Sequence, residues 1–104
     1  MRHTDFATIT GSPVVDRDGE RVGTATDVIY DDTDLRPRWV VVRYGSLRHR
    51  YTAVPFDRLY VTQDGEVATE PDKTAILQAP RVKGAPLSRE EENELARYFQ
   101  LAAG

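Results

Sequence analysis

The residues of this chain that are able to do chemistry are few and lie far apart. Its two histidines, His3 and His49, are separated by most of the first half, and the sequence has no cysteine. No Ser–His–Asp arrangement is suggested, because Ser12 and Ser46 fall near turns and Ser88 is explained by capping a helix. Catalysis needs convergent groups. We therefore expect a non-enzymatic protein with no catalytic residue, no cofactor and no small-molecule substrate.

Two acidic clusters raise the question of a metal site. The segment Asp16 to Glu20 is superficially similar to a calcium loop, but its twelfth position holds Asp27 instead of a bidentate glutamate. The second cluster is Asp31, Asp32 and Asp34, whose oxygens suit a hard cation. Short acidic side chains also hydrogen-bond the backbone within turns, which explains this cluster equally well. We favour the turn and predict no metal ion.

A basic stretch is the stronger candidate for a binding site. Residues 35 to 56 contain five arginines and no acid. We expect Arg43 and Arg50 to face each other across a hairpin, with Arg48 at its tip and two tyrosines nearby. Arginines beside aromatic rings bind phosphate and stack on bases. The alternative, which we favour, is a solvent-exposed strand pair whose arginine stems cover apolar surface. If this edge binds RNA or an acidic protein, Arg43, Arg48 and Arg50 are the candidate partner-binding residues.

Composition limits the class of protein. The chain has 104 residues, of which 39% are hydrophobic and 30% charged, as in one soluble globular domain. A net charge of −3 argues against a strong nucleic-acid binder. The N-terminus has no apolar core of a signal peptide, and the longest apolar run, Trp39 to Val42, is far shorter than the roughly 20 residues of a membrane helix. We expect a cytoplasmic protein without membrane contact.

Alternating apolar residues and turn signals predict about six short strands. Asp18-Gly19 and Asp64-Gly65 are strong hairpin signals, because glycine adopts positive φ without a steric penalty. Residues 37–44 form the strongest strand, apolar on both faces at its centre, as in a strand covered on both sides. The other predicted strands are 14–15, 21–30, 50–54, 59–62 and 66–69. Trp39, Tyr44, Tyr51, Phe56 and Tyr60 are expected in the core or at the rim. This spacing favours a sandwich or a small barrel.

The last third of the chain predicts two helices. Residues 72–78 fit one or two helical turns that end before Pro80. Ser88 and Glu91 form a capping box at the start of a helix from 89 to about 101. We divide the chain into a barrel domain, residues 1–86, and a C-terminal helical segment, residues 87–104.

The C-terminal helix has one apolar stripe that must be buried. Leu95, Tyr98, Phe99 and Ala102 are spaced i, i+3, i+4 and i+7, which places them on one face. The stripe packs either on its own barrel or on a second copy of the chain. Leu95, Tyr98 and Phe99 are therefore candidate self-association residues, and we expect a homodimer, because short barrels with apolar edges often pair.

Several segments resemble the PRC-barrel domain family. Residues 11–28 are similar to the family's opening, in which a "dGe.iG.v.Dv" hairpin begins a small barrel. Residues 39–45 match its central "yavv..G" strand, and residues 54–59 match its "vPw..l" segment, with Phe56 where tryptophan is common. Ala79-Pro80 and the capped helix resemble the ending of stand-alone bacterial members. The order and spacing of these motifs extend over nearly the whole chain.

The resemblance implies a fold and a role. It implies an all-β protein, a six-stranded PRC-type barrel followed by a C-terminal amphipathic helix. The family is named after the barrel of the photosynthetic reaction centre H subunit, and a similar barrel occurs in a ribosome maturation factor that handles ribosomal RNA. Both imply a docking module. We expect a self-associating protein-interaction adaptor with an unidentified protein partner; the alternative is an RNA-linked module that uses the arginine-rich hairpin in ribosome maturation or RNA processing.

Overall fold

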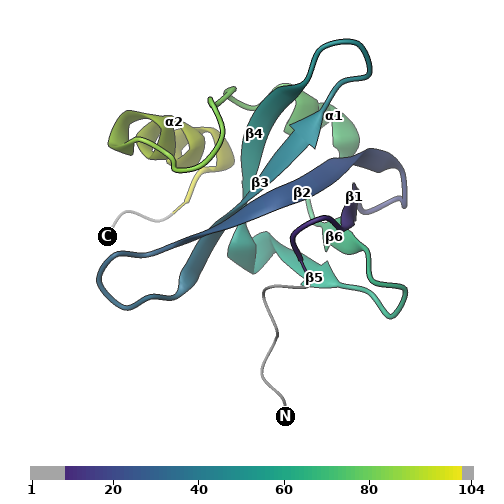
Figure 1. Ribbon diagram of the computed structural model, residues 1–104, viewed down its shortest axis with the longest axis horizontal. Coiled ribbons are helices and arrows are strands. Elements are labelled where there is room, and N and C mark those ends of the chain that lie inside the picture. Colours follow the sequence, from purple (N-terminus) through teal and green to yellow (C-terminus); the bar gives the residue numbers. More distant parts are fainter. Residues whose placement is uncertain (1–8, 102–104) are drawn as a thin grey trace.

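Six strands and two helices make up the part of the protein that the structure describes. The computed structural model in Figure 1 describes residues 9–101. The strands are β1 (Pro13–Val15), β2 (Arg21–Tyr30), β3 (Pro37–Tyr44), β4 (Arg50–Pro55), β5 (Leu59–Val61) and β6 (Val67–Thr69). The helices are α1 (Lys73–Leu77) and α2 (Arg89–Phe99), and a 3₁₀ turn, η2 (Phe56–Arg58), joins β4 to β5. The predicted six-stranded, mostly β fold with a C-terminal helix is confirmed.

All six strands belong to one sheet, in the order β4-β3-β2-β1-β6-β5. Neighbouring strands are antiparallel except β1 and β6, which pair in parallel. The register of β2 against β3 shifts twice, between Ala25 and Asp27 and between Ile29 and Tyr30. Such bulges bend a strand and increase its twist. The sheet is thereby curved around an interior, and β4 and β5 remain its two edge strands.

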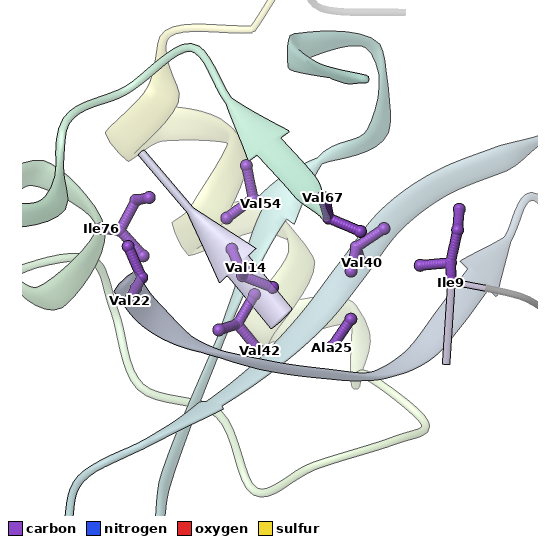
Figure 2. Close-up of a cluster of buried hydrophobic side chains, with 9 residues drawn as sticks. All are labelled: Ile9, Val14, Val22, Ala25, Val40, Val42, Val54, Val67 and Ile76. Carbon is purple, nitrogen blue, oxygen red and sulfur yellow. The ribbon is translucent and has the colours of Figure 1, made fainter. Parts of the chain in front are cut away.

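The concave face of the sheet encloses the first of two apolar cores. Nine buried side chains from five strands, α1 and the segment before β1 converge there (Figure 2). They are Ile9, Val14, Val22, Ala25, Val40, Val42, Val54, Val67 and Ile76. Most are β-branched, which suits a pleated surface that packs closely. This group fills the interior of the barrel-like sheet.

The outer face of β3 and β4 carries the second core, and α2 covers it (Figure 1). Because side chains alternate along a strand, Val40 and Val42 enter the first core while Trp39 and Val41 enter the second. All four are at most 1% exposed, which confirms that this strand is covered on both sides. The partners of Trp39 and Val41 are Ala53, Ala79, Val82, Leu87, Leu95 and Phe99.

The capping box fixes where α2 begins. The Glu91 backbone N–H donates to Ser88 Oγ at 3.0 Å, and the Ser88 backbone N–H donates to Glu91 Oε1 at 2.8 Å. The helix ends at Phe99, about two residues before the predicted end, because Gln100 adopts a left-handed conformation with φ of 57°. The Trp39 indole N–H donates to Glu92 Oε1 at 3.3 Å, which adds a polar contact at the edge of the second core.

Removing the buried leucine of α2 tests how much this helix contributes to the fold. We expect Leu95→Ala to lower the free energy of unfolding by about 2–5 kcal/mol, because the side chain is fully buried and leaves a cavity. Urea denaturation followed by circular dichroism measures the change. The matched control is Leu47→Ala at a fully exposed position, for which we expect a change within about 0.5 kcal/mol. Equal effects of both variants would contradict the packing described here.

Candidate interaction surfaces

Asp31, an acidic residue beside a hollow in the surface, stabilises a turn. A groove of about 800 Å³ separates the β2–β3 turn from α2. On its wall, Asp31 Oδ1 accepts the backbone N–H groups of Thr33 at 2.7 Å and Asp34 at 3.2 Å, and Asp31 Oδ2 pairs with Arg38 at 3.1 Å. These donors lower the pKa of the Asp31 carboxyl, and the two backbone N–H groups have the largest effect. The carboxylate is thus held in its charged form by the turn that it stabilises.

Asp16 has a structural role that the sequence analysis missed. Its Oδ1 accepts the backbone N–H groups of Asp18 and Glu20, each at 2.9 Å, which shapes the β1–β2 turn. Its Oδ2 accepts the backbone N–H of Lys73 at 2.8 Å, 57 residues along the chain at the start of α1. Burial raises the pKa of Asp16, but the three backbone donors outweigh it and lower the pKa. The local signal for this role is Asp two residues before Asp-Gly.

Other polar groups that the sequence singled out are not brought together. Within residues 9–101, no group of three or more His, Cys, Asp or Glu side chains is arranged to hold a metal ion. His49 is exposed on the β3–β4 loop, and Ser88 caps α2. His3 and Ala102 lie outside the described residues. Neither helix in the described part of the chain is long and apolar enough to cross a membrane.

The β3–β4 hairpin does not have the arrangement that the sequence predicted. Arg43 lies opposite Tyr51, and Arg50 lies opposite Tyr44. Because neighbouring residues on a strand point to opposite faces, Arg43 and Arg50 point to opposite faces of the sheet, and the expected facing pair is wrong. The reason is the five-residue loop from 45 to 49, which makes Tyr44 and Arg50 the last pair and so offsets the arginines by one residue.

The two tyrosines of this hairpin are packed, while the arginines remain accessible. Tyr44 is 9% exposed, and Tyr51 packs against the second core. Arg43 is half-buried, whereas Arg48 and Arg50 are exposed. None of the ion pairs within residues 9–101 includes these three arginines. The hairpin therefore presents uncompensated positive charge, and the one exposed ring beside it is the His49 imidazole, not a tyrosine.

The three candidate self-association residues on α2 have different surroundings. Leu95 and Phe99 are buried in the second core of their own chain. Tyr98 is 39% exposed, and its hydroxyl donates to the Ala75 carbonyl of α1 at 2.7 Å. Its ring also makes an edge-on contact with Phe99, with centroids 5.0 Å apart. Of the three, only Tyr98 offers surface to a second molecule.

The edge strand β5 presents both apolar side chains and free backbone groups. Tyr60 is 65% and Val61 43% exposed. The Thr62 backbone N–H donates to the Glu66 carbonyl, and the Glu70 backbone N–H donates to the Arg58 carbonyl. Hydrogen-bonded pairs alternate along an antiparallel ladder, so Tyr60 and Ala68, midway between these two pairs, form the next one. The backbone N–H and C=O groups of Leu59 and Val61 consequently point away from β6. No strand in residues 9–101 pairs with this side of β5.

The low pKa values predict how stability depends on pH. The folded-state pKa values of Asp16, Asp31 and Glu91 lie below their ordinary values, so each carboxylate stabilises the fold at neutral pH. This stabilisation is lost as the pH falls below about 4 and through the folded-state values. We expect Asp16→Asn to be less stable than the parent at pH 7, because an amide nitrogen does not accept the Lys73 N–H.

The same substitution flattens the pH profile. We expect the urea midpoint of Asp16→Asn to change less than that of the parent between pH 7 and pH 3. The matched control is Asp32→Asn, since Asp32 is an exposed acid in the β2–β3 turn. If Asp16→Asn and Asp32→Asn had the same midpoint and the same pH profile, the assigned role of Asp16 would be wrong.

Comparison with known sequences adds one match. The sequence profile of the PRC-barrel domain matches residues 2–76, which span all six strands and end within α1. A search of curated proteins finds no similar protein. The helix α2, which covers the outer face of β3 and β4, lies beyond the matched residues.

Proposed function

The chain belongs to the PRC-barrel domain family, and from this premise we propose that it is a non-catalytic protein-interaction and assembly module that self-associates. The observation that supports the proposal most directly is the edge strand β5, with exposed Tyr60 and Val61 beside outward-pointing backbone groups. An edge of this kind is a template for pairing with another strand. The non-catalytic part is supported by the acidic side chains described above, which accept backbone N–H groups and stabilise turns.

A second copy of the same chain is the occupant that suits this edge. Antiparallel pairing about a twofold axis places each strand against itself. With Tyr60 at the centre, Leu59 of one copy lies opposite Val61 of the other, and both residues have their hydrogen-bonding groups on this side. The two sheets then form one continuous sheet with four new backbone hydrogen bonds at its centre.

The side chains are compatible with this register. The two exposed Tyr60 rings lie opposite each other across the non-hydrogen-bonded pair, where side chains approach most closely. Arg58 lies opposite Thr62, so the register brings no like charges together. The edge is only three residues long. We therefore expect a weak dimer at the low end of interface size, below about 1,200 Å² in total.

Light scattering after size exclusion measures this association over a range of concentrations. The average mass should rise from the monomer value of 11.7 kDa towards twice that value as the concentration increases. Val61→Pro should hold the protein at the monomer mass, because it removes an outward N–H that has no role in pairing with β6. Val61→Lys should do the same by placing charges on the edge.

The controls separate edge pairing from a general loss of apolar surface. Leu35→Lys adds the same charge at a residue that is 73% exposed in the β2–β3 turn, and it should associate as the parent does. Circular dichroism establishes that each variant is folded. A parent chain that stays at 11.7 kDa throughout the concentration range, or Val61→Pro and Val61→Lys variants that associate like the parent, would overturn the proposal.

A further inference from the structure

The tip of the β3–β4 hairpin carries a fully exposed leucine. Tyr44 and Arg50 are the last pair of the hairpin, and residues 45–49 form its loop. Gly45 has φ of 99°, and a Cβ at this position would collide with the Arg48 carbonyl oxygen, so the tight turn requires glycine. The loop carries Leu47 outward, with 100% of its surface exposed. No other large hydrophobic side chain in residues 9–101 is exposed to this extent.

Positive charge surrounds this leucine. Arg48 and Arg50 are exposed beside it, and Arg43 lies at the base of the hairpin. No ion pair within the described residues includes any of the three. No acid occurs between residues 35 and 56, although the chain as a whole has a net charge of −3. The hairpin is therefore a positively charged region of a protein whose net charge is negative.

The acidic counterpart lies at the other end of the same strand. β3 extends from Pro37 to Tyr44, with the acidic β2–β3 turn before it and the basic β3–β4 loop after it. Figure 1 shows the two loops at opposite ends of the molecule, the basic one at the top and the acidic one at the lower left. An anionic surface attracts the first and repels the second, so it orients the molecule with the β3–β4 tip towards it.

The combination of exposed groups favours a lipid surface over RNA. Single-stranded RNA is bound by several exposed aromatic rings among cationic groups. Here Tyr44 is buried and Tyr51 packs on the second core, which leaves the His49 imidazole as the one exposed ring of the hairpin. The exposed apolar group is aliphatic instead. Aliphatic side chains flanked by arginine bind at the boundary between headgroups and acyl chains, where the cations meet lipid phosphates. We propose that the β3–β4 tip docks the protein on an anionic lipid membrane, with Leu47 inserted and Arg48 and Arg50 contacting phosphates.

This contact is peripheral and independent of the β5 edge. The expectation of no membrane contact rested on the lack of a long apolar run. A peripheral contact needs no membrane-spanning segment, so hydropathy does not detect it. The apolar and the electrostatic contributions supply the two signals that membrane association generally needs. Removing either one should weaken binding markedly.

Vesicle co-sedimentation of the full-length protein tests the proposal. The probes are vesicles of phosphatidylcholine alone and of phosphatidylcholine mixed with phosphatidylglycerol. The parent should bind only the anionic vesicles, and less tightly as salt increases. Leu47→Ser should weaken binding about tenfold, whereas Leu47→Phe should retain it. Arg48→Gln and Arg50→Gln should each weaken binding about fivefold.

Two control variants lie at the acidic end of β3. Leu35→Ser and Arg36→Gln remove an exposed leucine and an exposed arginine from the β2–β3 turn, and both should bind as the parent does. Equal binding to neutral and anionic vesicles, or no binding to either, would overturn the proposal. So would a Leu47→Ser variant that binds like the parent. Binding of single-stranded RNA that needs Arg48 and Arg50 but not Leu47, without binding to anionic vesicles, would assign the tip to RNA instead.

Discussion

The burial of both faces of β3 is the constraint on which the structure depends. Val40 and Val42 fill the interior of the curved sheet, while Trp39 and Val41 need a cover on the other side. That cover is α2, whose Leu95 and Phe99 pack on the outer face of the same chain. The apolar stripe of the helix is thereby used in holding the fold together. The centre of β3, from Trp39 to Val42, is apolar on both faces, and its two charged residues, Arg38 and Arg43, lie towards its ends.

This arrangement leaves the margins of the protein as the proposed interaction surfaces. Both cores are filled by side chains, and Asp16 and Asp31, two well-placed carboxylates, are occupied by backbone donors and an arginine. Accessible apolar groups occur at the β5 edge and at the β3–β4 tip, among other places on the surface. An edge offers backbone hydrogen bonds, and a projecting loop offers charge and one leucine. Binding at such places leaves the two cores intact, which suits a module that brings other components together.

Local signals in the sequence predicted much of the fold, because they act over a few residues. The Asp-Gly turns place the hairpins, the run of β-branched residues identifies β3, and the Ser88–Glu91 box locates the start of α2. What the sequence did not predict depends on long-range or exact pairing. Arg43 and Arg50 do not face each other because the register of β3 against β4 differs by one residue from the register that would pair them. The contact of Asp16 with Lys73 and the edge position of β5 follow from the parallel pairing of β1 with β6, distant in sequence. Tyr60, expected in the core or at the rim, is exposed for the same reason.

The most direct test of the central claim, that the edge strand and not the C-terminal helix is the self-association surface, is a dilution series followed residue by residue with ¹⁵N-labelled protein. The amide resonances of Leu59 and Val61 should shift with concentration, because their outward N–H groups gain hydrogen-bond partners in the dimer. The amides of Leu95 and Phe99 should stay unchanged, because they are already packed on their own barrel. Concentration-dependent shifts along α2 with none in β5 would show that the helix, not the edge strand, is the self-association surface.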